Sequence, residues 1–192
     1  MTIYEFYSTE FKKLSDAKVA REKAEAEAKA KTEQEFKERI KTLLPNILKD
    51  MFEWGMKATE NMPPEAYEFI KEIINIEVEE GCDDSDLELV IDQDMIRCRT
   101  YDDEYSFFTE EPFSTSDYSD YSEFVKATES RLNLVFYPAS PNFIRVEIWL
   151  DDSNYDDPEN KPLLDVLQEL YGNHIECDYS YVYFDVDIDK IK

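Results

Sequence analysis

The sequence predicts an α+β fold in which a long N-terminal helix and short helices pack on a mainly antiparallel β-sheet. Residues 9–44 contain neither Gly nor Pro, which favours a long helix. Later segments alternate apolar and polar residues, as half-buried strands do. Hydrophobic residues make up 42% of the 192-residue chain, enough for the core of one domain with an extension. We therefore expect a long helical extension over residues 1–44 and an acidic α+β domain over 45–192, with a helical layer (45–75) and a sheet-rich part (76–192).

The long helix is predicted from Thr9 to Leu44 because residues 17–31 are almost all strong helix formers. Acid-before-base pairs at i,i+4 spacing should add roughly 0.2–0.5 kcal/mol each. These pairs are Glu25/Lys29, Glu27/Lys31 and Glu33/Lys37. Large apolar residues stand at both ends of the helix, the first group being Tyr4, Phe6, Tyr7, Phe11 and Leu14.

Between these ends the helix carries a row of small residues, too weak for a leucine-type coiled coil. The candidate oligomerisation residues are Ala17, Ala20, Ala24, Ala28, Phe36 and Ile40. Two interpretations stay open: a solvated helix with anchored ends, and a seam that packs on a second copy and forms a homodimer.

Pro45 is expected to kink or end this helix, because proline lacks an N–H and disfavours helical geometry at the preceding residue. A second helix should then end near Glu60, and a third should begin near Pro64. Both carry apolar faces suited to covering a sheet.

Strands and short helices are predicted to alternate in the rest of the chain. The expected strands are residues 87–91, 96–98, 132–137, 143–150 and 175–188, and the expected helices are 121–130 and 162–171. The Pro-containing link at 138–141 predicts that the strands on either side of it form an antiparallel pair. Capping-box spacing at Asp120–Glu123 sets the start of the helix over 121–130. Gly172 sets the end of the helix over 162–171.

The last predicted strand has an unusual outward face, on which tyrosines continue into carboxylates about 6.6–6.8 Å apart. Its residues are Tyr179, Tyr181, Tyr183, Asp185, Asp187 and Asp189. Like charges that close reduce stability. The pattern indicates either a charged edge that prevents aggregation or a binding surface, and both stay open.

Charge is segregated along the chain. Residues 76–192 hold 31 acids and 8 bases, whereas residues 1–75 hold 15 acids and 13 bases, within a net charge of −25. Such a charge excludes most proteins that bind nucleic acid or anionic membranes directly. It predicts a basic protein partner.

Acids and aromatics are interleaved in stretches without any base, notably residues 100–125. Tyr beside carboxylate suits contact with Arg, which pairs with one group and stacks on the other. The further candidate partner-binding residues are Asp102, Asp103, Glu104, Asp117, Asp120, Asp151, Asp152, Asp156 and Asp157. The alternative for Phe107, Phe108, Phe113 and Phe124 is that they enter the core.

Catalytic and cofactor motifs are absent from the sequence. His174 is the sole histidine, the three glycines do not cluster as phosphate-binding loops require, and the calcium-like run from Asp152 has Asp157 where Gly is needed. We therefore expect no enzyme activity, no metal and no cofactor.

The cysteines and the hydropathy of the chain bear on where the protein acts. Cys82, Cys98 and Cys177 indicate reduced thiols. The chain lacks a membrane-length apolar run and a leader, so a soluble cytoplasmic protein is expected.

These observations predict a non-enzymatic acidic binding protein that blocks a cationic, nucleic-acid-binding surface of a partner protein. In composition the chain resembles DNA-mimic inhibitors, such as phage anti-defence and anti-CRISPR proteins. On this resemblance it would be a viral protein acting in the host cytoplasm. The alternatives are an immunity protein that neutralises a basic toxin, and a scaffolding protein assembled through the N-terminal helix.

Overall fold

A computed structural model describes residues 2–80, 87–93, 95–100, 104–108, 113, 119–138, 140–150, 155–172 and 174–191. The chain divides into two compact units, Met1–Arg39 and Ile40–Lys192, which we call the arm and the body. The sequence placed this boundary after Leu44. Ile40, Leu43 and Leu44 are buried, which explains why the body begins earlier.

The first helix, α1 (Ile3–Glu60), is continuous through Pro45, so the predicted break is wrong. Leu44 and Leu48, on either side of the proline, are both buried. Burying the two side chains contributes about 3–6 kcal/mol together, whereas a proline inside a helix costs about 3 kcal/mol. Packing on both sides therefore holds the helix together where local preference would end it.

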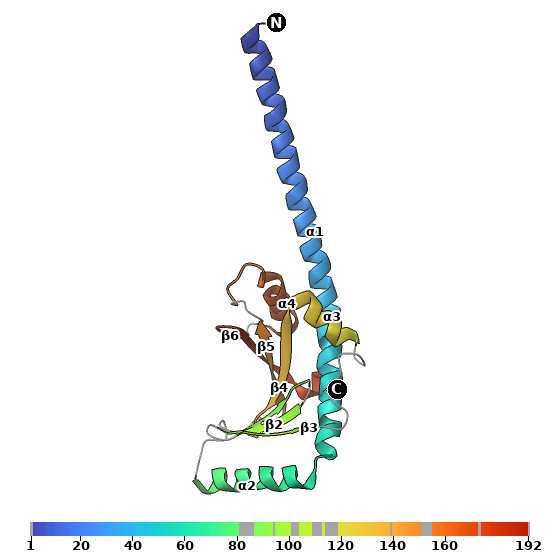
Figure 1. The fold of residues 1–192 in the computed structure, drawn as a ribbon, viewed down its shortest axis with the longest axis vertical. Helices are drawn as coiled ribbons and strands as arrows, with labels where there is room; N and C mark the ends of the chain where they lie inside the picture. Colours follow the sequence, from blue (N-terminus) through green and yellow to red (C-terminus); the bar gives the residue numbers. More distant parts are fainter. Residues whose placement is uncertain are drawn as a thin grey trace. The chain divides into compact units, whose positions relative to one another are not determined.

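The body contains a seven-stranded sheet in the order β3-β2-β1-β4-β5-β7-β6, with every adjacent pair antiparallel (Figure 1). The strands are β1 (Glu88–Ile91), β2 (Met95–Arg99), β3 (Glu104–Phe108), β4 (Ser130–Phe136), β5 (Phe143–Leu150), β6 (Glu176–Asp178) and β7 (Tyr181–Asp187). The predicted antiparallel pairing of the strands around the 138–141 link is confirmed by the β4–β5 register.

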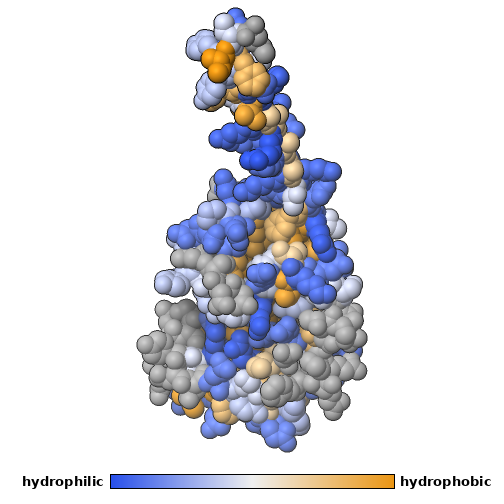
Figure 2. Space-filling view, turned by 45° about the horizontal axis from the view of Figure 1, so that its top comes forward, coloured by the Kyte–Doolittle hydropathy of each residue, from blue (hydrophilic) through white to orange (hydrophobic). Residues whose placement is uncertain are grey.

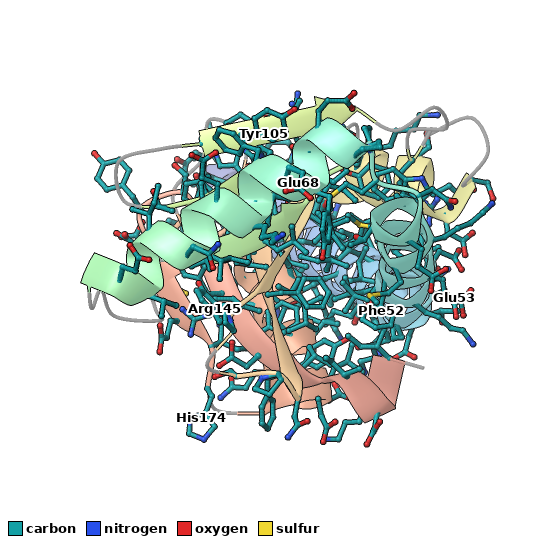
Figure 3. The ribbon with its side chains drawn as sticks, turned by 90° about the horizontal axis from the view of Figure 1, so that it is seen from below. Phe52, Glu53, Glu68, Tyr105, Arg145 and His174 are labelled. Carbon is teal, nitrogen blue, oxygen red and sulfur yellow. The ribbon has the colours of Figure 1, made fainter. Side chains whose placement is uncertain are left out.

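Helices cover one face of this sheet. They are the end of α1, α2 (Pro64–Glu80), α3 (Ser119–Thr128) and α4 (Lys161–Tyr171), with the short α5 (Ile188–Ile191) at the C-terminus. Ring contacts join α1 to β4 (Phe52–Phe136), α2 to β3 (Phe69–Tyr105) and α4 to β7 (Tyr171–Phe184). In Figure 3, α2 crosses beside Tyr105, and Phe52 points into the body while Glu53 on the same helix points away. The α+β fold predicted from the sequence is confirmed.

The two faces of the sheet have different chemistry. On β5, Ile144, Val146 and Ile148 are fully buried toward the helices. The intervening residues include Arg145, Glu147 and Trp149, and we call their side the polar face. The register places charged or tyrosine residues of β7, β1 and β2 on this same face.

Two strand predictions need correction. β3 was not predicted, because its residues lie in a stretch interpreted mainly through its acids and aromatics. The single strand predicted over 175–188 is a hairpin, β6 and β7, followed by α5. The core alternative is confirmed for Phe107, Phe113 and Phe124, all buried, whereas the side chain of Phe108 lies outside the described residues.

Candidate partner-binding surface

The hairpin of β6 and β7, residues 176–187, concentrates acid and tyrosine at one edge of the sheet, and we call it the acidic hairpin. Its register sets Glu176 opposite Tyr183 and Asp178 opposite Tyr181, so acids and tyrosines share the polar face. The rings of Tyr181 and Tyr183 stack with centroids 5.8 Å apart. The segment contains four acids and no base. It gathers five of the predicted site residues, Tyr179, Tyr181, Tyr183, Asp185 and Asp187.

The turn of the acidic hairpin presents Tyr179 to solvent. Tyr179 and Ser180 form a two-residue turn, and Tyr179 has φ +51° with 78% of its surface exposed. This left-handed conformation costs an L-residue roughly 1–2 kcal/mol. Strained residues are often found at binding sites. The turn was missed because Tyr-Ser lacks the Gly, Asn or Pro that marks most hairpin turns.

Residues before α4 lie against this turn. The Tyr155 N–H donates to the Tyr179 carbonyl at 3.1 Å, and the Leu150 N–H donates to the Ser180 carbonyl at 2.8 Å. Asp156 is exposed, and Asp157 is half-buried with its carboxylate accepting the Glu159 N–H at 3.0 Å. The structure therefore brings these two predicted site residues close to the acidic hairpin.

The arginines of the sheet all lie on the polar face and all have partners. Arg145 Nε donates to Asp185 Oδ1 at 3.0 Å, Arg99 pairs with Glu88 and Glu147, and Arg97 lies 3.7 Å from Glu104. Arg131 lies over the Trp149 ring at 5.2 Å. These four side chains were not singled out from the sequence, because only the strand register shows that they share one face. The charges of Arg97, Arg99 and Arg145 are balanced mainly by carboxylates on β1, β3, β5 and β7.

Glu147 lies at the centre of the polar face with 7% of its surface exposed. Burial raises its pKa, while the Asn133 amide, at 3.4 Å, and the Arg99 guanidinium oppose that shift. Burial and the neighbouring Glu88 likewise raise the pKa of Tyr137 to about 12. The centre of this face is thus a buried, internally paired network, whereas the acidic hairpin at its edge is the part available to a partner.

Three of the four carboxylates of the acidic hairpin form no ion pair among the residues that the structure describes. Glu176, Asp178 and Asp187 have no Lys or Arg within ion-pairing distance, whereas Asp185 is held by Arg145. Arg145 also lies close enough to Glu176 for their charges to interact. The carboxylates outside any ion pair therefore lie on β6 and at the end of β7.

Other predicted site residues lie elsewhere. Glu104 is exposed on β3, at the opposite edge of the sheet and about 29 Å away across six strand spacings. Asp120 begins α3 close to Asp50, whose pKa is raised by burial and then by Glu53 and Asp120. Asp189 lies in α5, beyond the strand that was expected to carry it. The predictions on Asp102, Asp103, Asp117, Asp151 and Asp152 lie outside the described residues.

Most ion pairs along the arm join side chains that remain largely exposed, and the Glu33–Lys37 pair is half-buried. The predicted Glu33–Lys37 pair is present at 3.0 Å. Glu25 and Glu27 pair with the preceding bases Arg21 and Lys23 instead of with the predicted following ones. Each exposed pair of this kind contributes about 0.3–0.5 kcal/mol.

The predicted oligomerisation residues divide between the two units. Ala17, Ala20, Ala24 and Ala28 are exposed on the arm, and Phe36 is half-buried. Ile40 is fully buried in the body, so it is not available to a second chain. The seam prediction therefore applies only to the arm.

The N-terminal end of the helix is not anchored as the solvated-helix interpretation expected. Its large apolar side chains are 52–89% exposed, and they are Ile3, Tyr4, Phe6, Tyr7, Phe11, Leu14 and Val19. Figure 2 shows apolar side chains gathered at this end of the arm. They form the largest exposed apolar group on any described helix.

The sole histidine and the described cysteines differ in their exposure. His174 is exposed at the periphery of the body (Figure 3). Cys98 is a buried free thiol whose pKa burial raises to about 11, and Cys177 is a half-buried free thiol. No three His, Cys, Asp or Glu side chains of the described ranges are placed to hold a metal ion.

Comparisons with protein-family models, curated proteins and solved structures found no match to this chain. None of the helices in the described part of the chain is long and apolar enough to cross a membrane.

Proposed function

We propose that this chain is a non-enzymatic binding protein whose acidic hairpin covers a cationic, nucleic-acid-binding surface of a partner protein. The observation that carries the proposal is the set of acids and tyrosines on one face of β6 and β7, with Glu176 and Asp178 outside any ion pair of the described residues. A DNA-mimic inhibitor acting in the cytoplasm is the form of this function that best fits the charge.

Arginine is the side chain that this surface suits best. Its guanidinium can pair with Glu176 or Asp178 while its plane stacks on a tyrosine ring. The exposed ring of Tyr179 and the Tyr181–Tyr183 stack supply such rings beside the carboxylates. A surface that binds nucleic-acid phosphates presents Arg and Lys in the same way.

The network on the polar face supports this assignment. Because Arg97, Arg99 and Arg145 are held by carboxylates of other strands, they offset the charge on β6 only through the interaction of Arg145 with Glu176. An anionic surface attracts a basic partner over several ångströms, and salt screens that attraction. Association should therefore be fast and should weaken as salt is added.

The test is competition for DNA. A labelled duplex is bound to each member of a panel of basic nucleases and DNA-binding domains, and the full chain is added while fluorescence anisotropy is followed. We expect the chain to displace DNA from at least one member, and to do so less well as salt rises from about 50 to about 200 mM. Failure to displace DNA from any member at the lower salt would contradict the proposal.

A matched pair of variants separates the surface from net charge alone. Glu176→Gln with Asp178→Asn removes two charges from the acidic hairpin, and Glu22→Gln with Glu27→Gln removes two from the arm. The hairpin variant should displace DNA at least about tenfold less well, since two charge-assisted contacts are worth more than 1.4 kcal/mol together. Equal weakening by the arm variant would show that the hairpin is not the binding surface.

A second candidate function is scaffolding through the arm, and the exposed apolar end favours it. Residues 1–39 carry nine acids and nine bases, so two arms would not repel each other as two bodies would. Sedimentation of the wild-type chain and of Phe11→Lys with Leu14→Glu tests it, with Val78→Lys as an exposed apolar control on α2. Assembly that the arm variant abolishes and the control retains supports this function, and a monomer at all concentrations contradicts it.

A further inference from the structure

The body contains a cavity of about 400 Å³ whose lining shares only Asp187 with the acidic hairpin. It lies on the helix-covered side of the sheet, where α1 meets β1, β4 and the end of β7. Phe52, Met56, Leu89 and Phe136 line it with apolar surface. Pockets that hold small ligands begin at about 300 Å³ and are lined in this way, with a few polar groups that set orientation.

The walls of the cavity are fixed by contacts on the core side. Phe52 and Phe136 are in ring contact at 6.1 Å, and Ile91 is fully buried. Met56 is 42% exposed, which places it where the cavity opens to solvent. The space is therefore formed by packed elements and is reached past a flexible side chain.

Two acidic residues at the end of β7 complete the lining. Asp187 and Asp189 both contribute to it, and the Asp189 N–H donates to Asp187 Oδ1 at 2.9 Å. The Ile188 N–H donates to the Asn142 carbonyl at 3.0 Å, which ties this segment to the turn after β4. None of the described lining residues is Lys, Arg or His.

We propose that this cavity is a binding site for an apolar group that carries a positive charge, such as an aryl- or alkylammonium. The hydrocarbon part fills the space between α1 and the sheet, and the ammonium donates hydrogen bonds to the carboxylates of Asp187 and Asp189. An anionic ligand of the same shape is disfavoured by these carboxylates and by the net charge of the chain. The proposal does not depend on what the acidic hairpin binds.

Three probes of one shape test the charge preference. Binding of 1-naphthylmethylamine, 1-naphthalenemethanol and 1-naphthoate to the full chain is measured by titration calorimetry and by NMR of labelled methionine methyl groups. We expect the amine to bind about tenfold more tightly than the alcohol, as one charge-assisted contact would give, and the carboxylate to bind weakest. The Met56 methyl signal should shift. Equal affinities for the three probes, or no saturable binding of the amine, would overturn the proposal.

Substitutions locate the site. Met56→Trp should fill the opening and abolish binding of all three probes, while thermal unfolding confirms that the fold is retained. Asp187→Asn with Asp189→Asn should weaken the amine about tenfold and leave the alcohol unchanged. The control removes the same charge elsewhere, through Glu176→Gln and Asp178→Asn. If the control weakens the amine as much, the cavity carboxylates are not its partners and the proposal fails.

The cationic group could come from a free amine or from a side chain of another protein. A blocked peptide with adjacent Phe and Lys is therefore tested for displacement of the naphthyl amine, with a Phe-Gln peptide as control. Displacement by the Lys peptide alone supports a protein side chain as the natural occupant, and no displacement by either supports a free amine.

Discussion

The arm and the body differ in both their charge balance and the exposure of their apolar residues. Residues 1–39 carry nine acids and nine bases, so their net charge is zero, and several of them form exposed ion pairs along one helix. Residues 40–192 carry 37 acids and 12 bases, and thus the whole net charge of −25. The arm leaves its large apolar residues exposed, whereas the body buries its own between helices and sheet. In the body, the free energy gained by burying apolar side chains offsets the repulsion between its carboxylates.

The comparison also separates the two candidate functions. A neutral helix with exposed apolar residues at its end is suited to contact with an uncharged apolar surface. An anionic sheet edge with exposed tyrosines is suited to a cationic one. The following substitutions test whether different forces stabilise the two units.

The largest difference is expected between two leucines of the same helix. Leu48 is 1% exposed in the body and Leu14 is 71% exposed in the arm. Leu48→Ala should lower the free energy of unfolding by about 2–5 kcal/mol, because it leaves a cavity in the core. Leu14→Ala should change it by less than about 0.5 kcal/mol. Urea unfolding followed by tryptophan fluorescence measures this, since both tryptophans, Trp54 and Trp149, lie in the body. A large loss for Leu14→Ala would mean that another chain covers the arm in solution.

A smaller effect is expected where α1 approaches the sheet most closely. A Cβ added at Gly55 would lie 2.2 Å from Ile91 Cδ1, inside the distance of any real contact. Gly55→Val should therefore destabilise the body by about 1–3 kcal/mol through overpacking. Ala26→Val in the arm is the matched control and should cost only about 0.5 kcal/mol of local helix stability. Tolerance of Gly55→Val would show that α1 does not pack against β1 as closely as described.

The sequence predicted those parts of the fold that local chemistry determines. The antiparallel pair around residues 138–141 and the helix that ends at Gly172, where φ is +87°, follow from proline, glycine and alternation. The helix was predicted to break at Pro45, but packing of Leu44 and Leu48 against residues far along the chain overrides that local signal. The turn at Tyr179 was missed because its two residues carry no local turn signal.

The candidate site was predicted only in part for the same reason. Alternation in β7 identified Tyr181, Tyr183 and Asp185, because one strand fixes which residues share a face. The partners of the arginines, and the cavity between α1 and the sheet, depend on the strand order β1-β4-β5-β7. No pattern within a single segment contains that order.

Removing a proline should stabilise the body, and adding one should reduce the helix content of the arm. Pro45 is exposed within α1, so Pro45→Ala restores a backbone donor and loses little packing. The substitution also lets the unfolded chain adopt more conformations, which offsets part of this gain. The free energy of unfolding of the body is therefore expected to rise by about 1–2 kcal/mol. The counterpart Ala24→Pro should reduce helix content in circular dichroism and leave the fluorescence-detected unfolding of the body unchanged. A shift of that transition by Ala24→Pro would show that the two units unfold together.

The smallest effect concerns the one nearly buried carboxylate of the polar face. Because burial raises the pKa of Glu147 above its ordinary value of 4.5, the folded protein holds this proton more tightly than the unfolded chain does. Ionisation of Glu147 should therefore weaken the body as pH rises from about 4.5 through the raised pKa. Glu147→Gln keeps the size of the side chain and its contact with Asn133, and should remove this part of the decline. Urea midpoints are measured across that pH range. The midpoint of the variant should exceed that of the wild type by an amount that grows as pH rises. Parallel curves would mean that Arg99 compensates the buried charge completely, and that the centre of the polar face is held by its ion pairs as firmly as its core face is held by burial.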